Sequence, residues 1–115
     1  MRAGDLRHRV TIQSRSPDRD ELGQPSLDWV DLPSGTIWAD IQPMSARERM
    51  VAMANHSELT HTVIIRYQAQ FADPLYMATL RIKYGSRAFN IQGSIDPDER
   101  HKSLELACNE GLSDG

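Results

Sequence analysis

One stretch decides the fold class of this chain: Leu80-Arg81-Ile82-Lys83-Tyr84-Gly85-Ser86-Arg87-Ala88-Phe89-Asn90-Ile91. Its first five residues alternate apolar and cationic side chains, which is the two-residue period of a β-strand with one buried face. Gly85-Ser86 then forms a two-residue turn, because glycine adopts the positive φ that such turns require. Phe89 and Ile91 continue in a return strand. The stretch therefore predicts an antiparallel β-hairpin.

The same alternation recurs along most of the chain outside this hairpin. Further strands are predicted at 7–15, 27–32, 36–42, 61–67 and 103–108, and the return strand of the hairpin continues to Ile95. Pro33-Ser34-Gly35 separates the second strand from the third, and 96–99 forms a turn. Residues 68–78 fit neither a strand nor a helix period, although Asp73-Pro74 marks a turn among them. Six or seven short strands with long loops predict a mainly β fold, a small barrel or sandwich, because such folds remove open sheet edges.

One segment has the spacing of an α-helix. Ser45 precedes Glu48 by three residues, as in a capping box, where the serine oxygen accepts from a free backbone N–H and the glutamate reaches back. Met50 and Met53 follow at helical spacing. One short helix is therefore predicted at about 46–55. Its methionines have two interpretations, a face packed into the core or an adaptable docking surface.

The chain of 115 residues is predicted to form a single domain, 1–115, with frayed ends at 1–5 and 111–115. No apolar run approaches the roughly 18–20 residues of a membrane helix, and 1–5 lacks the apolar segment of a secretory signal, so we expect no membrane association. Cys108 is the only cysteine, which excludes a disulfide within the chain and fits a reducing compartment. Its position in an alternating strand predicts a small core residue.

Charge is unevenly distributed along the sequence. The formal net charge of −3 argues against a strongly basic nucleic-acid-binding domain. Residues 1–19 hold five arginines against two acids, whereas residues 96–115 hold six acids against two cations. Two interpretations remain open: both ends are solvated, or opposite ends of neighbouring copies meet in a head-to-tail interface of the kind that forms rings.

The sequence shows no pattern typical of catalysis, of a cofactor site or of a metal site. Its four histidines lie outside any H-E-x-x-H or C-x-x-C arrangement, and His56 and His61 lack an obvious third ligand. There is no G-x-S-x-G nucleophile motif and no glycine-rich phosphate loop. We therefore expect no catalytic, cofactor-binding or metal-binding residues, and a small hydrolase is disfavoured.

A small barrel that binds single-stranded nucleic acid is the alternative function. Such a barrel carries aromatic side chains interleaved with cations on one face of its sheet. The candidates are Tyr67, Tyr84 and Phe89 beside Arg66, Lys83 and Arg87.

The order of several motifs adds a more specific indication. They are Gly4-Asp5-Leu6-Arg7-His8-Arg9-Val10-Thr11-Ile12-Gln13, Gly23-Gln24-Pro25 followed by Trp29, Ile37-Trp38-Ala39-Asp40-Ile41, Ser45-Ala46-Arg47-Glu48, Thr60-His61-Thr62-Val63-Ile64-Ile65-Arg66-Tyr67, Arg81-Ile82-Lys83-Tyr84-Gly85, Phe89-Asn90-Ile91 and Asp96-Pro97-Asp98-Glu99-Arg100. In this order they resemble the phage head–tail joining family, which includes the head-closure (stopper) proteins of long-tailed bacteriophages. The resemblance spans about 4–110.

The resemblance implies a small β-barrel with one helix, acting as a connector subunit in a stopper or adaptor role. It implies a ring, commonly of twelve copies, that lies below the portal and adaptor at the head–tail joint of the virion. Such a ring retains packaged DNA and presents a platform for the tail, after its subunits fold in the host cytoplasm. The modest charge of the chain fits a channel through which DNA slides without sequence-specific binding.

The function is therefore expected to depend on exposed surfaces. The candidates are the polar loop 16–25 with Asp18, Arg19 and Glu21, the strand residue Trp38, and the helix residues Arg47, Glu48, Arg49, Met50 and Met53. Trp38 has two interpretations. It packs against the helix or a neighbouring copy, or it covers the barrel mouth or a second small core.

Overall fold

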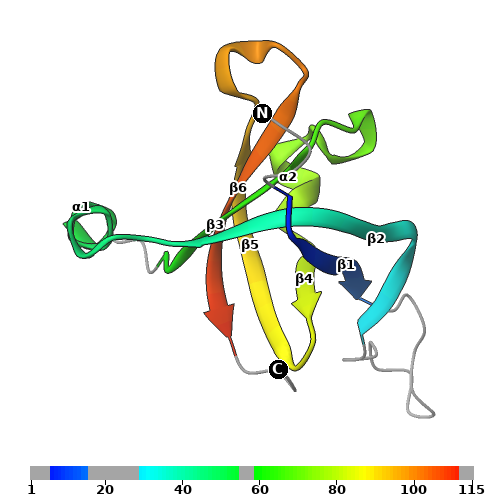
Figure 1. The fold of residues 1–115 in the computed structure, drawn as a ribbon, viewed down its shortest axis with the longest axis horizontal. Coiled ribbons are helices and arrows are strands. Elements are labelled where there is room, and N and C mark those ends of the chain that lie inside the picture. The colour runs from blue at the N-terminus through cyan, green and yellow to red at the C-terminus, as the bar shows by residue number, and fades with distance from the viewer. Residues whose placement is uncertain (1–5, 16–28, 55–58, 112–115) are drawn as a thin grey trace.

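A computed structural model describes residues 6–15, 29–54 and 59–111 (Figure 1). Six antiparallel strands form a closed barrel in the order β1-β2-β3-β6-β5-β4, which confirms the predicted mainly β class. The strands are β1 (His8–Arg15), β2 (Trp29–Pro43), β3 (His61–Arg66), β4 (Arg81–Tyr84), β5 (Arg87–Ile95) and β6 (Ser103–Gly111). The helices are α1 (Ala46–Ala54) and the single turn α2 (Pro74–Met77), with 3₁₀ turns at Ala69–Phe71 and Pro97–Glu99. No helix among the described residues has the length and apolarity to span a membrane.

The predicted hairpin is present as β4 and β5. Tyr84 pairs with Arg87 across the two-residue turn. Gly85 has a φ of 59°, as expected for glycine at the first central position of a type II′ turn. The inward-facing residues Ile82 and Phe89 are directly opposed and completely buried.

The core consists of the inward-facing side chains of all six strands. The fully enclosed members include Val10, Ile12, Ala39, Val63, Ile65, Ile82, Phe89, Leu106 and Cys108. The strand positions among them follow the alternation that the sequence predicts for each strand. Burial raises the pKa of the Cys108 thiol to about 12, so this cysteine is a small, unreactive core residue, as predicted.

Residues 68–78, which fit neither a strand nor a helix period, contribute to the core through two short helical turns. Phe71 and Met77 are almost completely buried and join the barrel core. The turn at Asp73-Pro74 begins α2: Pro74 occupies its first position, and the Asp73 carboxylate accepts a hydrogen bond from the Leu75 N–H at 3.0 Å. A single helical turn is too short to show a period in the sequence.

The prediction of two strands at 27–32 and 36–42 is wrong, because the described part of this region is one long strand, β2. Thr36 pairs with Thr11 and Asp31 pairs with Gln13, so 32–35 lie opposite Ile12 alone. Pro33-Ser34-Gly35 therefore forms a bulge within the strand, in which Ser34 has a φ of 57°. Such bulges bend a strand sharply and are common in small barrels.

Gly35 makes the close backbone approach that this bulge requires. A Cβ at Gly35 would lie 2.8 Å from the Ile12 carbonyl oxygen and 2.9 Å from that of Leu32. We predict that Gly35→Ala lowers the free energy of unfolding by about 1–3 kcal/mol, the usual cost of overpacking. Urea denaturation measures this change. Gly93→Ala is the matched control, since its Cβ would meet nothing within 4 Å, and its effect should stay below about 1 kcal/mol. Equal effects of the two substitutions would contradict the close backbone approach at Gly35.

Candidate interaction surface

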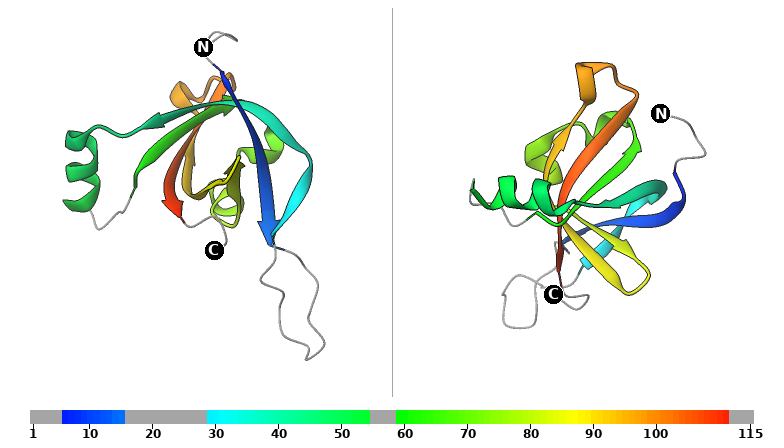
Figure 2. Two further views of the ribbon diagram at one scale, coloured as in Figure 1. Left: turned by 60° about the horizontal axis from the view of Figure 1, so that its bottom comes forward. Right: turned by 60° about the vertical axis from the view of Figure 1, so that its left-hand side comes forward.

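The helix α1 projects from the barrel on an arm formed by the ends of β2 and β3. These two strands pair from Ala39–Ile65 outward to Pro43–His61, and α1 lies beyond the last pair (Figures 1 and 2). None of its residues is buried. The predicted capping box is present: the Glu48 N–H donates to Ser45 Oγ at 3.2 Å, and the Ser45 N–H donates to Glu48 Oε1 at 3.3 Å. The sequence therefore starts the helix locally, without support from the core.

The exposed methionines of α1 decide between the two interpretations of this helix. Met50 is 70% exposed and Met53 is 67% exposed, so the interpretation that they pack into the core of their own chain is wrong. A nine-residue helix without tertiary packing is marginal in water, because its few hydrogen bonds hardly offset the cost of nucleation. The helix thus lacks the packing that usually stabilises one of this length.

The side chains of α1 are arranged around a methionine face. At about 100° per residue, Ala46, Met50 and Met53 lie on one side of the helix. Arg47 and Arg49 flank this face on its two sides, and Glu48 lies opposite it. The predicted surface residues of the helix therefore form one apolar stripe with cationic borders, which we call the methionine face.

A pocket of about 330 Å³ lies where α1 meets the barrel. It is lined by Arg49, Met53, Leu59, Thr60 and Asn109. Leu59 and Thr60 precede β3, and Asn109 belongs to the end of β6. Thr60 ties these ends together, since its N–H donates to the Cys108 carbonyl at 2.9 Å and its hydroxyl accepts from the Glu110 N–H at 2.8 Å. The pocket therefore lies between the methionine face and the hydrogen-bonded ends of β3 and β6.

Beside this pocket, three charged or polar side chains form a network that the sequence did not reveal. The Arg87 guanidinium binds both carboxylate oxygens of Glu110, at 2.8 and 3.1 Å. His61 Nε2 lies 3.4 Å from Arg87 Nη2 and 4.0 Å from Glu110 Oε1, and His61 Nδ1 lies 2.8 Å from Thr60 Oγ1. The hydrogen bond to Arg87 holds the pKa of Glu110 below its usual range. These contacts depend on the register of β5 against β6, for which the sequence offers no separate signal.

The other predicted surface residues lie apart from α1 or outside the described residues. Trp38 is 51% exposed on the outer face of β2, and the Arg9 guanidinium lies 5.1 Å from its ring centroid. Trp38 is therefore not enclosed, and the choice between a contact with a neighbouring copy and a cover over the barrel mouth or a second small core stays a prediction. Asp18, Arg19 and Glu21 fall outside the residues that the structure describes.

The aromatic residues of the nucleic-acid alternative do not form a stacking platform. Phe89 is completely buried in the barrel core. Tyr67 already stacks on His101 at 4.5 Å between ring centroids, and Tyr84 meets His8 edge to face. Bases bind to exposed aromatic faces that share one surface, which this set does not provide. Within the described ranges, no three His, Cys, Asp or Glu side chains gather as metal ligands would.

The contrast between exposed and buried methionines yields a stability test. Met77 is completely buried, whereas Met50 is exposed on α1. We predict that Met77→Ala lowers the free energy of unfolding by about 2–5 kcal/mol because it leaves a cavity. Met50→Ala should change it by less than about 0.5 kcal/mol. Thermal denaturation of both variants measures the difference. A large loss in Met50→Ala would mean that α1 packs on its own barrel.

The network also predicts a pH dependence of stability. Burial lowers the pKa of His61 from 6.5, with Glu110 acting in the opposite direction and Arg87 and Arg49 lowering it further. The unfolded chain then binds this proton more readily, so the free energy of unfolding falls as the pH drops below 6.5 toward the lower folded-state pKa. His61→Gln should lose less stability than the parent chain between about pH 7.5 and about pH 5.5. Identical slopes in denaturation curves across this range would refute the prediction.

Known proteins resemble this chain over nearly its whole length. The head completion protein gp7 of Enterobacteria phage HK97 is 26% identical over 111 residues, which cover 96% of this chain and 97% of that protein. The solution structure of protein SF1141 from Shigella flexneri 2a is 34% identical, with a TM-score of 0.71 and coverage of 96% of this chain and 97% of that one.

A chain in the virion of a native gene transfer agent particle shares the fold, with a TM-score of 0.59 at 19% identity, over 93% of this chain and 96% of that one. The family model described as phage head completion protein matches residues 1–111. A match of this extent covers the barrel, the projecting helix and the loops together. The chain therefore belongs to the phage head completion protein family.

Proposed function

We propose that this chain is a structural subunit of the head–tail connector, which closes the filled phage head and joins it to the tail. The observation that carries the proposal is the family match over residues 1–111, which includes every element of the fold. The projecting helix supports it from the geometry. An exposed methionine face on a rigid barrel suits a protein that acts by binding other proteins.

The connector role requires several copies and several partners. We infer a ring of this chain, of about twelve copies in the virion, with the portal or adaptor on one side and tail proteins on the other. Rings form when one surface of a subunit binds a different surface of the next, at an angle that closes. The subunit would reach this joint after folding in the host cytoplasm. Its stopper or adaptor role needs surfaces rather than catalytic groups.

Packaged DNA would pass through the ring without sequence-specific binding. The formal net charge of −3 supports this, since tight contact to many phosphates requires a basic surface. The binding of single-stranded nucleic acid is disfavoured, because Phe89 is buried and Tyr67 is already stacked on His101.

Deleting the gene tests the proposed function directly. We expect particles from the deletion strain to contain heads and separate tails but few joined virions, and the heads to lose their DNA. Electron microscopy counts joined particles, and nuclease protection measures retained DNA. A plasmid copy of the gene should restore both. Normal tailed virions in the deletion strain would refute the proposal.

A further inference from the structure

We propose that the methionine face of α1 in one copy packs across the outer wall of the barrel of the next copy. The wall is a row of four residues, Asp40, Ile64, Glu105 and Ile95, which we call the outer row. This contact rests on the ring of the proposed function and specifies its subunit interface. It joins two different surfaces, so every copy donates a helix and receives one.

The outer row follows from the register of four neighbouring strands. Asp40 of β2 pairs directly with Ile64 of β3, and Ile64 pairs with Glu105 of β6. Glu105 in turn pairs with Ile95 of β5. Directly opposed residues point to the same side of a sheet, and these point away from the core. Acids and isoleucines therefore alternate along one line across the wall.

Among the described residues, this row has one exposed isoleucine and two carboxylates without an ion pair. Ile95 is 63% exposed, which leaves a large apolar surface in water. Asp40 accepts a hydrogen bond from the Gln42 amide at 2.7 Å. In the part of the chain that the structure describes, no ion pair involves Asp40 or Glu105. The row thus offers apolar contacts and two carboxylates to a cationic, apolar partner.

The methionine face matches this row in size and in chemistry. Strands lie about 4.8 Å apart, so a row across four strands spans about 14 Å. A nine-residue helix is also about 14 Å long. Met50 and Met53 would cover the isoleucines, while Arg47 and Arg49 on the borders of the face would meet the carboxylates. Opposite charges around an apolar centre are typical of specific interfaces.

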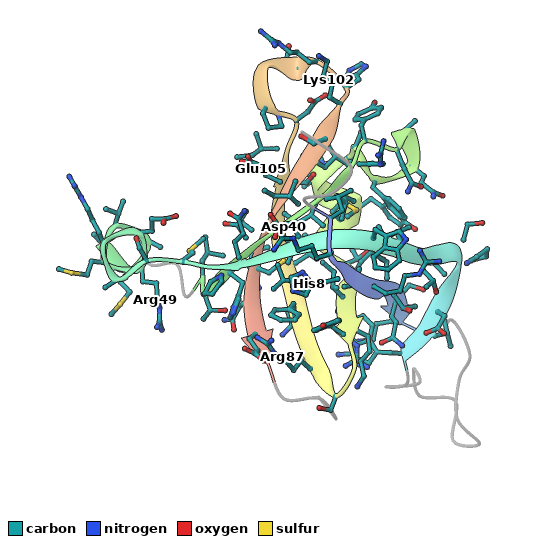
Figure 3. The ribbon with its side chains drawn as sticks, in the orientation of Figure 1. His8, Asp40, Arg49, Arg87, Lys102 and Glu105 are labelled. Carbon is teal, nitrogen blue, oxygen red and sulfur yellow. The ribbon has the colours of Figure 1, made fainter. Side chains whose placement is uncertain are left out.

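The geometry places this contact between copies. Figure 3 shows Arg49 on the projecting helix, well to the side of Asp40 and Glu105 on the barrel. The arm formed by β2 and β3 places α1 beside the ends of β3 and β6 rather than on the outer row, and no residue of α1 is buried there. The helix with its arginines and the outer row with its acids lie at separate places on the same chain. A second copy can therefore provide an outer row for the helix and a helix for the outer row.

Cysteine cross-linking in assembled particles tests the contact. In a chain with Met50→Cys and Ile95→Cys, the new thiols of neighbouring copies should form disulfides under mild oxidation. Denaturing gels without reductant should then show a ladder of covalent oligomers. Cys108 should not compete, because it is buried and its thiol pKa is about 12. A chain with only one of the two introduced cysteines, Met50→Cys or Ile95→Cys, should remain monomeric on the same gels.

Met50→Cys combined with Leu75→Cys is the matched control, because Leu75 is 82% exposed but lies on α2, outside the outer row. It should give no ladder. Joined particles without a ladder in the Met50/Ile95 pair would overturn the contact but leave the connector function standing. Dimers of the Met50→Cys chain alone would also overturn it, since they indicate helix-to-helix packing. Failure of the proposed connector function would be seen in a different experiment, because the deletion strain would then produce normal virions.

Charge reversal provides an independent readout. Arg49→Glu and Glu105→Arg should each reduce the yield of joined particles by about tenfold or more, because like charges then meet at the interface. The double variant R49E/E105R should recover most of this loss, since the pair is restored with reversed sign. Both single variants should unfold at the temperature of the parent chain. Absence of recovery in the double variant would refute the pairing of Arg49 with Glu105.

Discussion

The barrel depends on the seam between β1 and β4, where the sheet closes on itself. Only three pairs, Thr11–Lys83, Ile12–Ile82 and Gln13–Arg81, join these strands. Ile12 and Ile82 meet inside the seam and are completely buried. On its outer side the Arg81 Nε donates to Gln13 Oε1 at 2.8 Å, and the Arg81 guanidinium lies 4.6 Å from the Trp29 ring centroid. Because the sheet closes at this seam, neither β1 nor β4 has an open edge there. Closure also fixes the position of β2, whose far end forms part of the arm.

Local signals predicted the parts of the fold that depend on neighbouring residues. The Gly85-Ser86 turn and the box of Ser45 with Glu48 need only a few residues in sequence, and both are present. The bulge at Pro33-Ser34-Gly35 could not be predicted, because it arises from pairing with β1. The network of His61, Arg87 and Glu110 also required the strand register. The exposure of Met50 could not be predicted either. Periodicity identifies the apolar face of a helix, but it does not say what packs against that face.

The apolar side chains of the molecule fall into two groups, one enclosed in the barrel and one exposed to water. Inside, side chains such as Met77 and Cys108 are completely enclosed by the barrel. Outside, the methionine face and the outer row leave apolar atoms in water beside charges that form no ion pair among the described residues. The same residue type serves both roles, as Met77 and Met50 show. If these exposed surfaces bind partners as proposed, substitutions in the two regions would have separable effects on folding and on assembly.

The short, unsupported helix α1 has a consequence for the timing of assembly. A helix that gains its packing only when it docks transfers part of its ordering cost to the association step. If α1 docks as proposed, two free subunits would bind each other weakly, because association would also have to order the helix. A surface that already holds one subunit in position removes the rotational and translational cost for its neighbours, and the ring becomes favourable there. In the proposed ring, a helix of nine residues would therefore disfavour association in solution and favour assembly on a filled head.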